Sequence, residues 1–141
     1  MTARAKQRIR ESFPGVQEVA GPLSLLFYGR LFERDPALRT MFHGDIAKQG
    51  LKLMQMLTAV VEHLDEFETL TPVLHAMGQR HVAYGVKPEH YQSVGDALLW
   101  AMGQAFGADF DAETKRAWQA VVAQVSTVMK EGPAMLPEQN E

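Results

Sequence analysis

Apolar side chains recur every three or four residues along most of the chain, which is the spacing of amphipathic helices. The clearest examples are Leu23, Leu26, Phe27, Leu31 and Phe32, then Ile46, Leu53, Met56, Leu57, Val60, Val61 and Leu64, and last Trp118, Val121, Val122, Val125, Val128 and Met129. The last set is rich in β-branched residues, which favour strands, but its spacing is helical and does not alternate. We therefore expect helices throughout and no hairpin.

Four prolines stand where the first turn of a helix would begin, because proline lacks the amide hydrogen that this turn leaves unpaired. They are Pro22, Pro36, Pro72 and Pro88. Asp35 and Thr71 directly precede two of these prolines and are suitable N-caps. Asp111 is a third candidate cap, and we prefer this interpretation to a calcium loop because the glycine such a loop needs is missing.

These signals divide the chain into a helical domain over residues 1–131 and a tail over 132–141. We expect an early helix within residues 3–13 that ends at Pro14-Gly15. The later helices are expected near residues 22–34, 36–42, 46–64, 72–82, 88–106 and 112–131. The tail contains two prolines and little that could pack, so we expect it to be frayed.

Composition removes several functional classes. The 141 residues fit one domain, and 14 Lys and Arg against 17 Asp and Glu give a net charge of −3, which offers no basic excess for nucleic acid. The absence of cysteine excludes disulfides, thiolate metal sites and thioether-linked haem. No apolar run suits a signal peptide or a membrane span, so we expect a cytoplasmic protein without a membrane partner.

His81 is the most informative of the five histidines. It ends an apolar stripe that begins with Val73, Leu74 and Met77 on the expected helix after Pro72, and Gly85 follows as a helix terminator. Taken alone, such a histidine is more often a core residue bonded to a backbone carbonyl. The alternative is an axial ligand to the iron of a porphyrin, which needs partners elsewhere in the sequence.

Three blocks supply those partners. They read LFYGRLFERDPALRTMF at residues 26–42, QGLKLM at 49–54, and GQRHVAYGV at 78–86 followed by His90-Tyr91. In this order they resemble the globin family, most closely bacterial single-domain globins of the Vitreoscilla haemoglobin type and the haem domain of flavohaemoglobins. The resemblance covers about residues 3–131 and implies an all-α globin fold of about six to eight helices around a non-covalent b-type haem.

The resemblance also implies roles on the proximal side of the haem. His81 would be the iron ligand, and Tyr91 matches a tyrosine that bacterial globins place near this histidine. A glutamate of the last helix completes that network in the family. Here the matching place falls near Pro133, and Glu131 comes two residues early. The chain therefore departs from the family pattern at this relay, and Tyr91 is equally well read as a buried core tyrosine.

Further residues match haem contacts and the distal ligand site of the family. Phe42 would pack against the porphyrin, Val86 and Val94 would be apolar contacts, and Lys52 could reach a propionate, with Arg80 and His43 as weaker candidates. On the distal side the resemblance puts Tyr28, Gln49 and Leu53 over the iron, with Leu53 also touching the haem. Gln49 and Leu53 are four residues apart and share a helical face. The simpler alternatives are a core Phe42 and solvated Gln49 and Lys52.

The resemblance implies reversible binding of dioxygen, for storage or transport, and of other diatomic gases such as carbon monoxide and nitric oxide. Hydrogen bonds from Tyr28 and Gln49 to a ligand with partial negative charge predict slow release. Two alternatives stay open: a nitric oxide dioxygenase and a haem-based gas sensor. The sequence holds no flavin domain, so we expect the dioxygenase to need a separate reductase. The sequence leaves two questions open: whether the chain is an enzyme, and whether it is a monomer or a weak homodimer.

Overall fold

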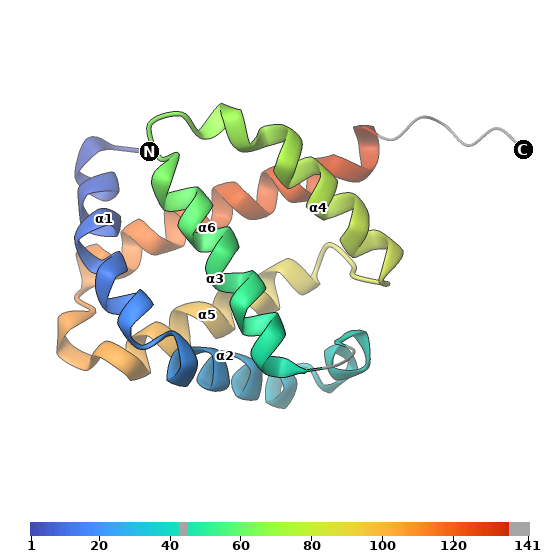
Figure 1. Cartoon of the computed structure of the whole chain (residues 1–141), viewed down its shortest axis with the longest axis horizontal. Helices are drawn as coiled ribbons and strands as arrows, with labels where there is room; N and C mark the ends of the chain where they lie inside the picture. The colour runs from blue at the N-terminus through green and yellow to red at the C-terminus, as the bar shows by residue number, and fades with distance from the viewer. Residues whose placement is uncertain (43–44, 136–141) are drawn as a thin grey trace, which may run out of the picture.

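The computed structural model describes residues 1–42 and 45–135, and all regular structure in these ranges is helical (Figure 1). The elements in chain order are α1 (Ala3–Glu18), α2 (Ala20–Arg34), η1 (Pro36–Met41), α3 (Ile46–Glu62), η2 (Phe67–Leu70), α4 (Thr71–Ala83), α5 (His90–Phe106), η3 (Gly107–Asp109), α6 (Ala112–Glu131) and η4 (Gly132–Met135). Elements marked η are 3₁₀ helices. The prediction of an all-α fold is confirmed.

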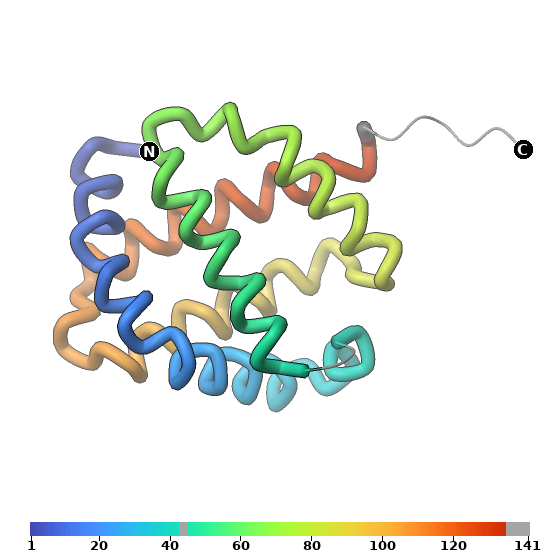
Figure 2. The backbone as a smooth tube through the Cα atoms, in the orientation of Figure 1, coloured from blue at the N-terminus to red at the C-terminus, as the bar shows by residue number. Residues whose placement is uncertain are grey.

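The helices pack against one another in pairs. α2 packs on α5, α4 on α6, and α1 on α6, while α3 crosses α2. Figure 2 shows α3 and α4 running apart from the η2 segment that joins them. α3 and α4 therefore border a wedge-shaped region of the fold, which we call the wedge.

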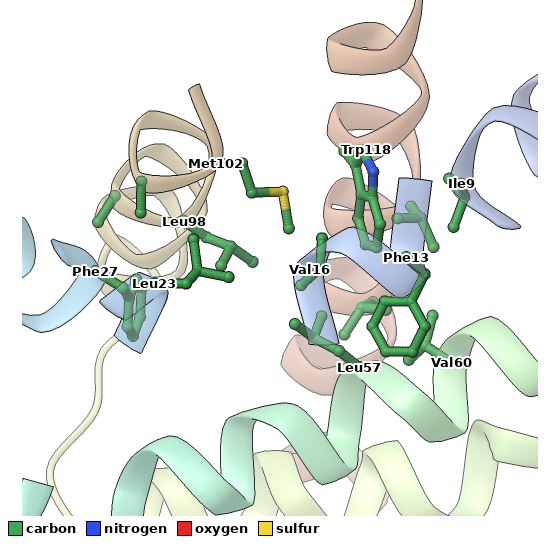
Figure 3. Packing of buried hydrophobic residues seen from close by; sticks show 14 of the residues in the cluster. Ile9, Phe13, Val16, Leu23, Phe27, Leu57, Val60, Leu98, Met102 and Trp118 are labelled. Carbon is green, nitrogen blue, oxygen red and sulfur yellow. The ribbon is translucent and has the colours of Figure 1, made fainter. Parts of the chain in front are cut away.

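The hydrophobic core fills the closed end of this wedge. Figure 3 shows side chains of α1, α3 and α6 gathered around Trp118, and a second group from α2 and α5 around Leu23 and Leu98. Trp118 is fully buried, and its indole N–H donates a 2.8 Å hydrogen bond to the Ser12 hydroxyl. A buried indole needs such a partner, so this bond joins α1 to α6 inside the core.

The predicted break at Pro14 is wrong, because α1 continues through this residue to Glu18. Proline removes one helical hydrogen bond, but Pro14 is exposed, on the side of α1 away from the core. The buried residues Phe13 and Val16 continue the apolar stripe on either side of it, and the Phe13 ring lies 6.2 Å from that of Trp118. Packing of this stripe therefore holds α1 together across the proline.

Three predicted helix starts also need correction. Thr71 is the first residue of α4 and not its N-cap, because η2 runs directly into the helix and gives Thr71 helical angles. α5 begins at His90, two residues after Pro88. Asp35 precedes η1 without a side-chain cap, and the short segment that follows is 3₁₀ and not α-helical. Asp111 does cap α6, since its carboxylate accepts from the Thr114 N–H at 2.8 Å.

The tail predicted to be frayed begins in an ordered segment. Residues 132–135 form η4, which packs against α4, and the Gln79 side-chain amide donates a 3.0 Å hydrogen bond to the Gly132 carbonyl. This contact extends α6 along α4. Residues 136–141, the rest of that predicted tail, lie outside the described residues.

Candidate functional site

A cavity of about 510 Å³ occupies the wedge between α3 and α4 and is also bordered by α2, η1, α5 and α6. All nine site residues predicted from the sequence line it. They are Tyr28, Phe42, Gln49, Lys52, Leu53, His81, Val86, Tyr91 and Val94. Residues up to 66 positions apart in the chain, from Tyr28 to Val94, are thus brought to one site by the fold.

His81 lies near the end of α4 and faces this cavity half-buried. Burial, together with the positive charge of Arg80, lowers the pKa of its imidazole below 6.5. The ring is therefore neutral at physiological pH, which is the form that donates a lone pair to a metal. Its Nδ1 lies 3.4 Å from the Tyr91 hydroxyl, which leaves Nε2 as the nitrogen that can bind a ligand.

The partner of His81 is an uncharged group. Burial raises the pKa of Tyr91, so its hydroxyl stays protonated near neutral pH. Glu131 does not join these two residues in the structure: its Oε1 lies 4.0 Å from Nε2 of His75, one and a half turns earlier on α4. The departure from the family relay that the sequence predicted agrees with this arrangement.

Tyr28 enters the cavity from α2 and is only 5% exposed. Its ring is held by neighbouring aromatic rings, with centroids 4.7 Å away for Phe27, 6.0 Å for Phe32 and 5.5 Å for Phe42. Burial raises the pKa of its hydroxyl to about 12. None of the side-chain hydrogen bonds among the described residues involves this hydroxyl, and Tyr28 borders the cavity, so the hydroxyl is available to a molecule bound there.

Gln49 and Leu53 come from the first two turns of α3. The Asp45 carboxylate caps this helix by accepting from the Ala47 N–H at 2.9 Å. Gly50 then allows α3 to lie against α2, since a Cβ at this position would sit 2.8 Å from the Ser24 hydroxyl oxygen. The close crossing brings Gln49, which is half-buried, to the same cavity as Tyr28.

The remaining predicted residues form the sides and the rim. Phe42, Val86 and Val94 are half-buried apolar side chains in the wall. Lys52 and Arg80 are exposed cations at its edge, where they could pair with carboxylates of a bound molecule. His43, the other candidate for that role, lies outside the described residues.

Several lining residues were not predicted as site residues. His90 and three partly buried methionines, Met41, Met56 and Met77, also border the cavity. Met56 could have been found, because it lies three residues after Leu53 and therefore on the same helical face. The place of Met41 and His90 depends on how η1 and the α4–α5 turn fold back on the cavity, which periodicity does not encode.

The residues present fit a haem. The cavity lies within the roughly 300–1,000 Å³ typical of small-molecule sites, and most of its wall is apolar. It also offers the neutral imidazole of His81 and a cationic rim for the propionates. Groups of three or more histidines and carboxylates able to hold a metal ion directly are absent from the described parts of the chain. Within residues 1–42 and 45–135, no helix has the length and apolar character needed to cross a membrane.

Comparison with known proteins gives the same result. The family model for globins, described as "Globin", matches residues 25–129. The neuroglobin of Tetraodon nigroviridis is 28% identical over 94% of this chain and 92% of its own length. A flavohemoprotein of Halalkalibacterium halodurans is 28% identical over 91% of this chain but only 32% of its own length.

A solved structure shows the same arrangement of helices. It is that of an engineered carbene transferase from Rhodothermus marinus, a candidate nitric oxide dioxygenase, with 25% identity, a TM-score of 0.85 and coverage of 95% of this chain and 94% of that one. The resemblance to bacterial globins and flavohaemoglobin haem domains is thereby confirmed, and membership of this family implies haem binding. Matching sequence, shared fold and a histidine facing a buried cavity place this chain in the globin family.

Proposed function

We propose that this globin holds a b-type haem non-covalently through His81 and reversibly binds dioxygen on the Tyr28 side, for storage or transport. The observation that carries the proposal is Tyr28, a buried residue that lines the cavity, whose hydroxyl stays protonated and takes part in none of the side-chain hydrogen bonds of the described residues. Buried hydroxyl groups normally have a partner, so a donor of this kind is suited to a ligand.

Bound haem would supply an iron atom able to bind dioxygen and other diatomic gases. His81 would provide an imidazole ligand through Nε2, while its Nδ1–H donates to the Tyr91 hydroxyl and thereby fixes the orientation of the ring. Phe42, Val86 and Val94 would hold the flat faces and edges of the group. Lys52 would pair with a propionate at the exposed rim.

Two donors would act on the gas ligand. The hydroxyl of Tyr28 and the side-chain amide of Gln49 can both donate hydrogen bonds to a ligand that gains negative charge on binding. Bonds to charged acceptors contribute on the order of 1.5–3 kcal/mol each. Together they would slow dissociation of dioxygen by about a hundredfold or more. Leu53 would limit the space around the ligand and exclude water.

The proximal side supports gas binding in preference to peroxidase-like chemistry. An anionic partner would raise the basicity of a ligating imidazole. Here the partner of His81 is the neutral Tyr91 hydroxyl, and the Glu131 carboxylate lies nearest to His75, 4.0 Å from its Nε2. Carbon monoxide and nitric oxide would enter the same site, because the apolar wall makes no distinction between small diatomic molecules.

Nitric oxide dioxygenase activity is the second candidate, and two comparisons favour it. One relative is named a flavohemoprotein, and a protein of similar structure is described as a candidate nitric oxide dioxygenase. This reaction converts nitric oxide and dioxygen to nitrate and leaves the iron oxidised, so repeated turnover needs an electron donor. The chain covers only 32% of that flavohemoprotein, and the electron donor that we propose is a reductase partner.

Visible absorbance tests the proposed function directly. The purified protein is reduced, and its spectrum is recorded before and after dioxygen is admitted and then followed for hours. We expect a strong Soret band that shifts to a stable oxygenated spectrum. His81→Ala should remove this band or change its position, because the iron loses its protein ligand. Protein that takes up no haem, or that oxidises within seconds, would contradict the proposal.

A second experiment separates the two candidate functions. The dioxygen-loaded protein is mixed with nitric oxide in the presence of a flavin reductase and NADH, and nitrate is measured over many equivalents. One equivalent of nitrate or less per haem favours the carrier. Repeated production of nitrate, at a rate that rises with the amount of added reductase, favours the dioxygenase.

A further inference from the structure

His90 makes a reciprocal pair of hydrogen bonds with the turn between α4 and α5. Its side-chain Nδ1 accepts from the Lys87 N–H at 2.9 Å, and its own backbone N–H donates to the Lys87 carbonyl at 3.0 Å. The side chain is only 7% exposed, and it is the one histidine classed as buried among the described residues. The arrangement resembles a capping box, in which a side chain and a backbone satisfy each other's donors.

This geometry fixes the form of the imidazole ring. A nitrogen that accepts an N–H carries no proton, so the neutral ring has its proton on Nε2. Nδ1 is therefore committed to the turn, while the opposite edge of the ring is free to border the cavity, which His90 lines. His90 thus binds the turn through Nδ1, while the rest of its buried ring lines the cavity.

The turn that His90 holds connects directly to the predicted iron ligand. Val86 donates its N–H to the His81 carbonyl at 2.9 Å, and Gly85 between them adopts a φ of +93°, which favours glycine. Tyr91, next in sequence to His90, contacts Nδ1 of His81. His81 is therefore tied to the start of α5 twice: through the backbone of the turn and through Tyr91.

We propose that His90 is a positioning residue of the haem pocket, which sets the place of His81 and Val86 by holding the Lys87 N–H. The inference rests on the haem binding proposed above. Without the Nδ1 acceptor, the Lys87 N–H of a part-buried turn loses its partner, and the turn can open toward solvent. The backbone of the turn and Tyr91, which both support the His81 ring, then move with the turn.

Two substitutions separate this role from simple filling of the core. His90→Asn keeps an acceptor oxygen close to the position of Nδ1, whereas His90→Leu keeps much of the volume and removes the acceptor. For His90→Leu we expect haem to be lost about tenfold faster to an excess of a haem-free scavenger globin. We also expect a shifted or broadened iron–histidine stretching band in resonance Raman spectra of the reduced protein. His90→Asn should stay close to the unsubstituted protein in both.

His63 provides a matched control. Its Nδ1 lies 2.7 Å from the Ala59 carbonyl at the end of α3, and it does not line the cavity. His63→Leu should lower stability without moving the iron–histidine band. The inference is overturned if His90→Leu matches the unsubstituted protein in haem loss and Raman band, or if His90→Asn is impaired as strongly as His90→Leu.

A measurement without haem keeps this test separate from the proposed function. In the haem-free protein, exchange of the Lys87 amide hydrogen followed by NMR should be slow, fast in His90→Leu and slow again in His90→Asn. Equal exchange rates in the unsubstituted protein and the two variants would contradict the role of His90 in holding the turn, even if haem binds as proposed. Failure of the unsubstituted protein to bind haem would instead contradict the proposed function.

Discussion

Gly78 in α4 lies so close to Met129 in α6 that a Cβ on the glycine would sit 1.9 Å from the Met129 carbonyl oxygen. The neighbouring atom belongs to the backbone, so no side chain can turn away to make room. The two helices therefore touch through their main chains at this crossing. Because Gly78 is three residues before His81, the contact also sets the position from which His81 enters the cavity.

Gly78→Ala is expected to destabilise the fold by about 3 kcal/mol or more, since α4 must move away from α6. Chemical denaturation measures this loss, and haem affinity should fall with it. Gly29→Ala is the control, because Gly29 lies inside α2 with nothing within 4 Å of its added Cβ. That change should stabilise by about 0.5–1 kcal/mol. Equal effects of the two substitutions would contradict the steric argument.

Tyr28→Phe is expected to speed dioxygen dissociation by roughly tenfold, because it removes one charge-assisted hydrogen bond and almost no volume. Stopped-flow replacement of dioxygen by carbon monoxide measures the rate. Tyr84→Phe is the matched control, since Tyr84 borders the same cavity but is 63% exposed, so that its hydroxyl can be solvated. An unchanged rate in Tyr28→Phe would remove this residue from the ligand site.

The proximal bond is expected to depend on Tyr91 and not on Glu131. Tyr91→Phe removes the hydroxyl 3.4 Å from Nδ1 of His81 and should shift the iron–histidine stretching band. Glu131→Gln should leave that band in place, because Glu131 lies beside His75. A band that moves in Glu131→Gln would show that the glutamate reaches the proximal network in the haem-bound protein.

Acid is expected to weaken the contact between α1 and α6. Arg4 and Arg8 bind the Glu113 carboxylate and lower its pKa from 4.5 to about 2. A depressed pKa in the folded state stabilises the fold above the unfolded value, and this contribution is lost as the pH falls from about 4.5 toward 2. Arg4 is exposed, and Arg8 and Glu113 are only partly buried, so solvent screens these ion pairs and the effect is modest.

Glu113→Gln should therefore lose less stability than the unsubstituted protein between pH 7 and pH 3, measured by urea unfolding. Glu18→Gln is the control, because Glu18 at the end of α1 is exposed and makes no salt bridge within the described residues. If Glu113→Gln and the unsubstituted protein respond equally to acid, the ion pairs do not contribute to folding.

The fold followed from the sequence wherever periodicity and capping agreed, and failed where packing opposed a local signal. α6 matched its prediction at both ends, because Asp111 caps it and its apolar stripe is long. Pro14 carries a strong local signal for a helix end, but Phe13 and Val16 pack into the core on both sides of it. Thr71 was predicted as the N-cap of α4, but it is the first residue of that helix, because the 3₁₀ segment η2 runs directly into α4.

The candidate site was named from the sequence through a family resemblance that rests on three blocks, and the structure brings all nine candidate residues to one cavity. What the blocks could not give was the partner of each polar atom. The position of Glu131 beside His75 depends on the distance between α4 and α6, and the hydrogen bond of His90 with Lys87 depends on a turn. Spacing along one helix holds no information about either.

The sequence by itself determined that the chain is helical, that it lacks thiolate chemistry, and that His81, Tyr28 and Gln49 are the residues to examine. Helical periodicity is a local property that can be read within one segment, the lack of thiolates follows from composition, and the three residues follow from the family resemblance of separate blocks. Only the tertiary structure decided that α4 touches α6 at Gly78, that Tyr28 has a buried hydroxyl, and that Glu131 lies away from Tyr91. These depend on how separate helices cross, since burial and polar partners are set by residues distant in the chain.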